Sequence, residues 1–461
     1  MSNREKAIHY AEANYSLFRS NLEELVRIPS ISTSTEHQQG IRSAAQFVEK
    51  LLHSIGILET KILETAGHPV VFGQYRTNKK NAPTVLVYGH YDVQPADPLD
   101  LWDTPPFEPS QRNDYLYGRG ASDMKGQIIA AMSAVDSIIK SGNPPVNLKF
   151  IYEGEEEIGS PNLPAFLEKY ADLLQSDVVL NPDSGMIAPN IPTIVYGLRG
   201  LAYFELRITG PDHDLHSGLF GGIVHNPAQV LADLISGMHD KDGVIKLDGF
   251  YDDVKELSEA ERKELLRLPV TDADLLAQTG VKQLWGEKNY TSNERTGARP
   301  TLDVNGMLSG FTGEGSKTVI PSWAMAKISM RLVPNQDPEK VHRQLIHYIE
   351  NNVPPTVSWD LKKYAGGKAF ISNTDHPGVI ALSEALETVW KVKPVYKLEG
   401  GSIPIVGEMK KSIGIDSVLT GFGLPNDNIH SPNERLHLPT WEKGILALIH
   451  FFYNYAGKYE N

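Results

Sequence analysis

The N-terminal part of the chain alternates between two hydrophobic patterns. Apolar residues at helical spacing cover residues 40–55 and 124–139. Short runs without polar alternation cover residues 84–88, 148–152 and 177–180. A run that is apolar on both faces is typical of a parallel strand with helices on both sides of its sheet. The alternation therefore predicts an α/β fold with a doubly wound, mostly parallel sheet.

The pattern changes after about residue 196. The stretch "GLRGLAYFELRITG" alternates apolar and polar residues like a half-buried strand, and so do "WAMAKISMRLVP" and "TVSWDLKKY". A helical pattern lies at residues 338–351, and a further helical patch lies at 253–268 within the otherwise polar segment 240–300. This order of strands and helices predicts a small α+β domain.

Helical and buried-strand patterns return near the C-terminus, at residues 378–390, 417–420 and 441–455. A chain of 461 residues is also longer than one hydrophobic core usually supports. We therefore expect a catalytic domain made of residues 1–198 and 371–461. The α+β domain, residues 199–370, is predicted to be inserted into it.

Composition limits the kinds of binding partner and the cellular location that we expect. The formal net charge is −13, which disfavours binding to nucleic acid or to an anionic membrane. The chain has no cysteine, so any metal ligands must be His, Asp or Glu. The opening "MSNREKAIHY" has no apolar core of a signal peptide, and no apolar run approaches the ~20 residues of a membrane span. These features predict a cytoplasmic protein that binds neither nucleic acid nor membrane.

The predicted strands end in side chains that can bind metal or move protons. These side chains are His90, Asp92, Asp123, Glu156, Glu157, Asp183 and His430. The carboxyl ends of strands in an open α/β sheet line one crevice, so we expect these groups to converge. Each residue alone has a simpler interpretation, as a loop residue, a turn residue or a helix cap. Their joint order at successive strand ends is the stronger signal.

Several carboxylates with two imidazoles and no thiolate favour divalent cations. Without a cation, carboxylates buried together repel one another strongly. Two ions about 3.5–4 Å apart form a known hydrolytic site. The sequence therefore predicts a hydrolase with two divalent metal ions.

Four stretches carry a family resemblance. "YGHYDVQP", "GRGASDMKG", "EGEEEIGS" and "NIHSPNE" resemble the metal-site motifs of the M20 family of di-metal peptidases and deacylases. Their order and spacing cover essentially the whole chain. "DLHSGLFGG", "KTVIP", "RLVPN" and "GGSIP" are most similar to the branch of cytosolic non-specific dipeptidases and carnosinases.

The resemblance implies a role for each residue of the site. His90 and Asp183 would bind one metal ion, Glu157 and His430 the other, and Asp123 would bridge them. Zinc is the default ion of the family, and manganese or cobalt also suits such ligands. Asp92 would orient the imidazole of His90, and Glu156 would be the general base. The peptide bond after Asp123 is expected to be cis.

The resemblance also implies residues that contact the substrate. Arg331 would bind the substrate carboxylate, and Thr318 and Ser402 would help to hold the substrate. His216 would stabilise the oxyanion from the inserted domain of a partner subunit, which makes that domain both lid and dimer contact. The expected enzyme is therefore a homodimer.

We predict hydrolysis of dipeptides or short peptides with a free C-terminal carboxylate. A deacylase of N-acyl amino acids, of the succinyl-diaminopimelate desuccinylase or acetylornithine deacetylase type, is the alternative because the metal ligands are shared. A carboxypeptidase and a non-catalytic protein with this fold also remain open. The presence of Glu156 and all five ligand positions argues against the non-catalytic reading.

Overall fold

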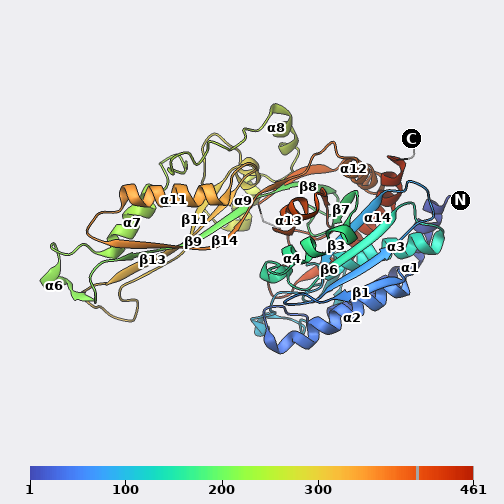
Figure 1. The fold of residues 1–461 in the computed structure, drawn as a ribbon, viewed down its shortest axis with the longest axis horizontal. Coiled ribbons are helices and arrows are strands. Elements are labelled where there is room, and N and C mark those ends of the chain that lie inside the picture. The colour runs from blue at the N-terminus through green and yellow to red at the C-terminus, as the bar shows by residue number, and fades with distance from the viewer. Residues whose placement is uncertain (401–403, 460–461) are drawn as a thin grey trace. The chain divides into compact units, whose positions relative to one another are not determined.

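The computed structural model describes residues 1–400 and 404–459 (Figure 1). The chain forms two compact units. The first consists of Met1–Tyr196, Ser372–Lys397 and Glu408–Asn461, and the second of Gly197–Ile371 and Leu398–Gly407.

A large mixed sheet has most of its strands in the first unit. Its strand order is β1-β2-β6-β3-β7-β17-β8-β15, and β16 also pairs with β8. The strands are β1 (Glu59–Leu63), β2 (Val70–Tyr75), β3 (Thr84–His90), β6 (Asn147–Glu153), β7 (Val178–Asn181), β8 (Thr193–Leu198), β15 (Phe370–Ile371), β16 (Val395–Glu399) and β17 (Ser417–Leu419). The central strands β6, β3, β7 and β17 are parallel, whereas β1, β2, β8 and β15 are paired antiparallel to their neighbours. The parallel centre brings several strand ends to one edge.

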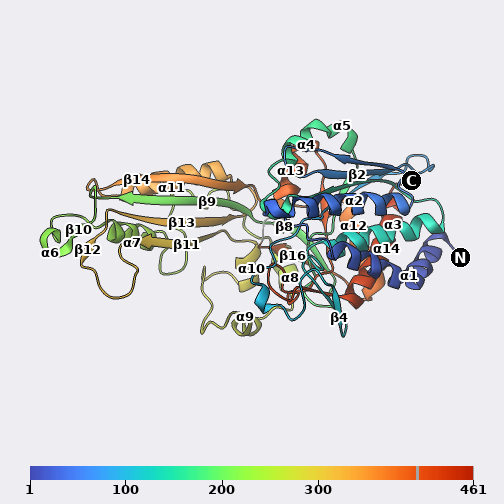
Figure 2. The same ribbon diagram turned by 90° about the horizontal axis from the view of Figure 1, so that it is seen from below.

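Helices pack together against this sheet (Figure 2). They include α1 (Asn3–Val26), α3 (Lys125–Ser141), α12 (Pro377–Trp390) and α14 (Leu438–Gly457). Of these, α3 contacts β3 and α12 contacts β17, while α2 (Gln38–Ser54) lies on β1 and β2. The residues of α3 from Lys125 to Ile138 are all buried, because the helix lies between the sheet and other helices. This packing explains why its sequence is apolar nearly all round.

Smaller elements complete the first unit. They are α4 (Leu163–Lys169), α5 (Ala171–Leu174), α13 (Pro404–Ile413), β4 (Ser110–Arg112), β5 (Tyr115–Tyr117), β18 (Arg435–His437) and the 3₁₀ turns η1 (Thr35–His37), η2 (Leu99–Leu101) and η3 (Glu156–Ile158). Strands β18, β5 and β4 form a small antiparallel sheet.

The second unit is a four-stranded antiparallel sheet with helices on one face. The strand order is β11-β13-β9-β14, and α7 and α11 pack on these strands. The elements are β9 (Gly200–Thr209), β11 (Thr301–Ser309), β13 (Trp323–Leu332), β14 (Ser358–Gly367), α7 (Pro227–Gly237) and α11 (Pro338–Asn352). Every second residue of β9 and β13 is buried, which is the alternation seen in the sequence. A two-stranded antiparallel sheet of β10 (Leu215–His216) and β12 (Val319–Ile320), with α6 (Ser217–Phe220), also belongs to this unit.

The polar segment of the second unit holds three short helices, α8 (Glu259–Leu265), α9 (Asp272–Thr279) and α10 (Ser292–Gly297). The helix predicted at 253–268 is shorter in the structure, where Ser258 caps it in a capping box with Glu261. The predicted fold class, α/β with a mostly parallel central sheet, is confirmed. Among the described residues, no helix is long and apolar enough to cross a membrane.

Candidate metal centre

Three neighbouring parallel strands deliver the polar side chains to one edge. β3 ends at His90, β7 is followed by Asp183, and β6 is followed by η3, which carries Glu156 and Glu157. Ligands bind at the carboxyl ends of such strands because the loops that follow them converge there. Asp123 precedes α3, and the peptide bond that follows it is cis, as expected.

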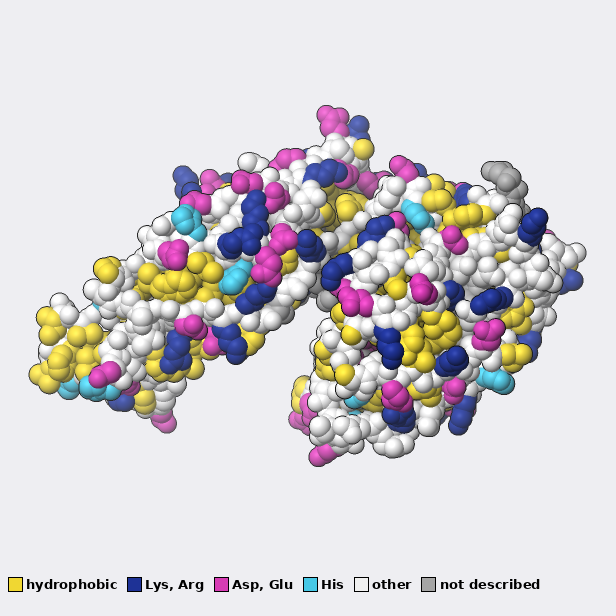
Figure 3. Space-filling model, viewed as in Figure 1, with side chains coloured by type: hydrophobic (Ala, Val, Ile, Leu, Met, Phe, Trp, Pro, Cys, Tyr) yellow, Lys and Arg dark blue, Asp and Glu magenta, His cyan; other side chains and the backbone are white. Residues whose placement is uncertain are grey.

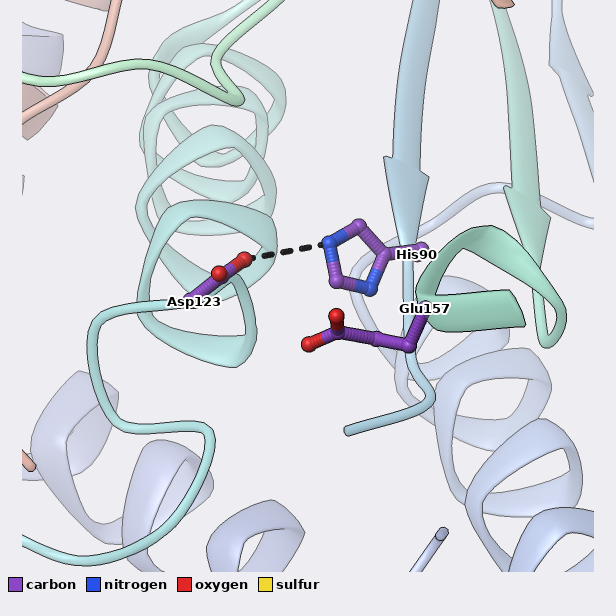
Figure 4. A group of neighbouring side chains, drawn as sticks. All are labelled: His90, Asp123 and Glu157. Atoms are coloured by element: carbon purple, nitrogen blue, oxygen red, sulfur yellow. Dashed lines mark hydrogen bonds and ion pairs between the residues drawn. The ribbon is translucent and has the colours of Figure 1, made fainter. Parts of the chain in front are cut away.

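Asp123 lies between two imidazoles. Its Oδ1 is 3.2 Å from Nε2 of His90, and its Oδ2 is 3.1 Å from Nε2 of His430. Figure 4 shows His90, Asp123 and Glu157 pointing toward one another from the end of β3, the start of α3 and η3. Their ligand atoms lie within 4.8 Å of one another, close enough to hold one metal ion.

The remaining carboxylates lie on both sides of Asp123, each near one of the two imidazoles. On one side, Nε2 of His90 is 3.8 Å from Oδ1 of Asp183 and 4.0 Å from Oε2 of Glu156. On the other, Nε2 of His430 is 3.2 Å from Oε2 of Glu157. The structure therefore brings together all the residues of the predicted metal set.

Asp92 organises two parts of the site. Its Oδ1 is 3.4 Å from Nδ1 of His90, and its backbone carbonyl is 3.1 Å from the same nitrogen. The backbone N–H groups of Glu156 and Glu157 donate to its carboxylate at 3.3 and 3.1 Å. The side chain is fully buried. It therefore contacts an imidazole and also fixes the backbone of the two glutamates.

Local backbone geometry positions His430 and the turn that carries Asp183. His430 has a φ of +59°, the left-handed region, within a loop that returns to β18. At the end of β17, the backbone N–H of Ser184 donates to the carbonyl of Thr420 at 3.1 Å. A Cβ on Gly421 would lie 1.5 Å from the Ser184 carbonyl oxygen, so only glycine lets the Asp183 turn approach this strand so closely.

The charges in the site are strongly unbalanced. Burial would lower the pKa of His90, but Asp183, Asp123 and Asp92 raise it well above its usual value. Hydrogen bonds from His430 to Asp123 and Glu157 raise the pKa of His430 to about 10. Both imidazoles are thus surrounded by excess negative charge.

The pKa values of three carboxylates in the site are raised as well. Burial raises the pKa of Glu156 well above its usual range, and the charges of Asp183, Asp123 and Glu157 raise it further against the effect of His90. Burial also raises the pKa of Glu157 and of Asp183. Only Asp123, bonded to both imidazoles, has a lowered pKa despite its burial.

This donor set fits divalent cations. Clustered carboxylates whose ionised forms are disfavoured need positive charge, and neutral imidazole with carboxylate is a usual ligand set for zinc or manganese. His90 is also oriented through its second nitrogen by Asp92, the arrangement typical of metal-binding histidines.

Three of the predicted substrate residues, His216, Thr318 and Arg331, lie in the second unit. His216 is in β10, paired with Val319 of β12, and the N–H of Ser217 donates to the Thr318 carbonyl at 3.1 Å. Arg331 is in β13 and pairs with Leu201 of β9. Thus His216 and Thr318 are on adjacent segments, Arg331 is on a different sheet, and Ser402 is outside the described residues.

The sequence interpretation missed three contributors to the site. Gln94 donates through Nε2 to the Glu157 carboxylate at 2.9 Å, the sulfur of Met124 accepts the backbone N–H of His90 at 3.2 Å, and Glu434 accepts the backbone N–H of Asp123 at 3.1 Å. All three lie within the quoted motifs "YGHYDVQP", "GRGASDMKG" and "NIHSPNE". The motifs marked these positions, but nothing in the sequence gave their partners.

The chain resembles known peptidases over most of its length. The model of "Peptidase family M20/M25/M40" matches residues 86–454. The Cys-Gly metallodipeptidase dug1 of Schizosaccharomyces pombe is 33% identical over 446 residues, which cover 93% of this chain and 93% of that protein.

Solved structures show the same likeness. The M20 family metallo-carboxypeptidase Sso-CP2 from Sulfolobus solfataricus has a TM-score of 0.86 and 34% identity, covering 95% of this chain and 99% of that one. Human carnosine dipeptidase 1 has a TM-score of 0.83 and 29% identity, covering 99% of each chain.

Proposed function

The chain belongs to peptidase family M20/M25/M40, and we propose that it is a dipeptidase that cleaves dipeptides or short peptides with a free C-terminal carboxylate. The resemblance inferred from the motifs is confirmed by the family match. The observation that carries the proposal is the single carboxylate of Asp123 between His90 and His430, with further carboxylates on both sides.

Each metal ion has its own ligands in this proposal. His90 and Asp183 would hold one ion, Glu157 and His430 would hold the other, and Asp123 would be shared by both. When bound, two divalent ions lower the pKa of a water molecule and polarise a carbonyl group, which is the chemistry amide hydrolysis needs. Zinc is the first candidate, with manganese or cobalt as alternatives.

Glu156 is the general base. Its Oε2 lies 4.0 Å from Nε2 of His90, and its backbone is fixed by Asp92. It takes the proton of the attacking water and passes it to the leaving amine. Asp92 holds the imidazole of His90 in one orientation, so the ligand enters the site already positioned.

The second unit supplies the contacts to the substrate. Arg331 binds the substrate carboxylate through its guanidinium group, and Thr318 and Ser402 hold the substrate nearby. The partner subunit's His216 donates to the oxyanion. In this view residues 199–370 form a lid and dimerisation domain, inserted between the catalytic segments 1–198 and 371–461.

A homodimer is supported by exposed apolar side chains near His216. Leu219 and Phe220 are 72% and 36% exposed, and Ile223, shortly after α6, is 77% exposed. Figure 3 shows hydrophobic side chains gathered around the α6 end of the second unit. Such a patch is typical of a protein interface. The cytoplasmic location stays a prediction.

The experiment is a substrate panel on metal-depleted protein reloaded with zinc, manganese or cobalt singly. The panel contains dipeptides, the same dipeptides with C-terminal amides, longer peptides, and N-acetyl and N-succinyl amino acids. We expect the free dipeptides to be hydrolysed fastest and the amides to be poor substrates, because Arg331 needs a carboxylate. A preference for N-acyl amino acids would indicate a deacylase instead. A preference for longer peptides would favour the carboxypeptidase activity named for the Sulfolobus relative.

A further inference from the structure

Glu434 is a fully buried carboxylate that the proposed reaction does not use. Its Oε1 accepts the backbone N–H groups of Ser122 and Asp123 at 3.0 and 3.1 Å. Its Oε2 accepts the N–H of Gly120 at 2.9 Å and a guanidinium N–H of Arg119 at 2.7 Å. One side chain therefore binds three backbone groups of the turn that carries Asp123.

Glu434 also belongs to the loop that carries His430. The N–H of Arg435 donates to the Asp427 carbonyl at 2.9 Å, which closes this loop, and β18 begins at Arg435. The N–H of Gly118 donates to the backbone carbonyl of Glu434 at 2.9 Å. The backbone of Glu434 is thus fixed to one side of the Asp123 turn, and its side chain is fixed to the rest of it.

A second bond joins the same two segments. The hydroxyl of Ser122 donates to the carboxylate of Asp427 at 2.9 Å, and Asp427 also accepts the N–H of Leu424. Both acids lie in the His430 loop, and both bind the residue next to Asp123. The two segments are far apart in the sequence, and these buried bonds, together with the pairing of β18 with β5, set their relative position.

This position matters because His430 and Asp123 face each other at 3.1 Å. We propose, on the basis of the function proposed above, that Glu434 is a positioning residue that holds the Asp123 turn and the His430 loop in register for metal binding. Outer groups that orient metal ligands typically contribute about 10–100-fold to metal affinity.

A glutamine at this position cannot replace the carboxylate fully. Its amide has one acceptor oxygen, and its NH₂ group would face backbone N–H donors. The buried guanidinium of Arg119 would also lose its anionic partner. We therefore expect Glu434→Gln to shift the turn while leaving all five predicted ligands in the chain.

The test measures metal affinity directly. Chelator-treated wild-type, Glu434→Gln and Glu434→Asp proteins are titrated with zinc in competition with a chromophoric chelator. We expect both variants to bind zinc about 10–100-fold more weakly than the wild type. The matched control is Glu287→Gln, which breaks a comparable buried pair with Arg299 in the second unit and should leave zinc affinity unchanged.

Kinetics measured from limiting to saturating zinc distinguish a positioning role of Glu434 from a purely structural role. A positioning residue predicts that KM stays near the wild-type value and that much of the lost kcat returns as zinc is raised. Thermal melting of the metal-free proteins shows whether each variant is folded, and Glu434→Asp remains informative if Glu434→Gln is not.

Equal zinc affinity in the wild type and both variants would overturn the proposal while leaving the dipeptidase function intact. A wild-type protein that binds no zinc, manganese or cobalt would overturn both.

Discussion

Each unit contains a cluster of charged residues, but the balance of positive and negative charge differs between the two clusters. In the first unit, the carboxylates of Asp123, Glu156, Glu157 and Asp183 surround only two imidazoles. In the second unit, carboxylates face guanidinium groups among the helices of the polar segment. These pairs are Arg299 with Glu287 and Glu256, and Arg262 with Glu294 and Glu256.

The second cluster is complete without a ligand. Nε and Nη2 of Arg299 donate to the same carboxylate oxygen of Glu287 at 3.1 and 2.8 Å, and its guanidinium lies 4.1 Å from the ring centre of Tyr290. The side chains of Arg299 and Glu287 are only 8% and 9% exposed. A buried charge that already has a matching partner is a structural feature, whereas a buried excess of one sign indicates a binding site. This difference separates the functional acids from the structural ones.

The variant with the largest expected effect removes a carboxylate from the first cluster but leaves all the predicted metal ligands in place. Glu156→Gln should lower kcat by about 10²–10⁴-fold, because it removes the general base. Zinc affinity should stay within a few-fold of the wild type. The measurement is steady-state kinetics with a dipeptide, alongside metal content. Wild-type turnover in this variant would show that Glu156 is not the base.

The next largest effect is a loss of stability in a variant that breaks the charge pairs of the second cluster. Arg299→Met should lower the free energy of unfolding by about 3–5 kcal/mol, because it leaves Glu287 buried without its partner. Denaturant unfolding with and without a chelator measures this change, and the loss should be the same in both conditions. The double variant Arg299→Met, Glu287→Leu should recover most of the loss. A loss that depends on metal would contradict the structural role of this cluster.

A third variant is expected to raise the stability of the metal-free protein and to lower the stability of the zinc-loaded protein. Burial and the charges of Asp123 and Asp92 raise the pKa of Asp183 despite His90, so its ionised form is disfavoured without a cation. Asp183→Asn should therefore stabilise the metal-free chain, because the amide removes a carboxylate whose ionised form is disfavoured there. With saturating zinc the same variant should be less stable than the wild type, because a ligand is lost. Thermal unfolding in both states tests this reversal, and destabilisation of the metal-free form would contradict it.

The smallest expected effect is a pH dependence of stability that arises from His450, which lies near the positive charges of Arg4 and Lys391. Burial, Arg4 and Lys391 lower the pKa of His450 to about 4, and its Nδ1 has no hydrogen-bond partner among the described residues. An unfolded histidine titrates near pH 6.5. The unfolded chain therefore binds more protons between these values, and this contribution to stability falls as the pH drops from about 6.5 to about 4.

Denaturant unfolding of wild type and His450→Gln across this pH range isolates the contribution of His450. We expect the stability of the wild type to fall relative to the variant as the pH drops, by a modest amount because the ring is partly exposed. Stability curves that stay parallel would show that the imidazole is not protonated on unfolding.

Strong periodicity made much of the fold predictable. The apolar runs at 84–88, 148–152 and 177–180 are β3, β6 and β7, and the helical patterns at 40–55 and 124–139 are α2 and α3. No pattern in the sequence predicted α1 or the antiparallel strands β1 and β2. The hydrophobic residues of α1 lie among many polar ones, and the pairing of β1 and β2 at the sheet edge depends on their neighbours.

The candidate site was predictable where neighbouring strands brought residues together. The proximity of His90, Asp123 and His430 follows from strand ends meeting at one edge and from the motifs. The bonds from Asp92 to the amides of Glu156 and Glu157 were not predictable, nor was the reach of Glu434 to the Asp123 turn. These contacts depend on how loops separated in sequence fold against one another. The roles of His216, Thr318, Arg331 and Ser402 stay predictions.

The most direct measurement is anomalous diffraction at the zinc absorption edge from crystals of the zinc-loaded protein. The account predicts two peaks per chain, about 3.5–4 Å apart, both in contact with Asp123. One should lie between His90 and Asp183, and the other between Glu157 and His430. Peaks found only elsewhere, or none within reach of Asp123 in zinc-saturated crystals, would contradict the claim that these side chains form a two-metal centre.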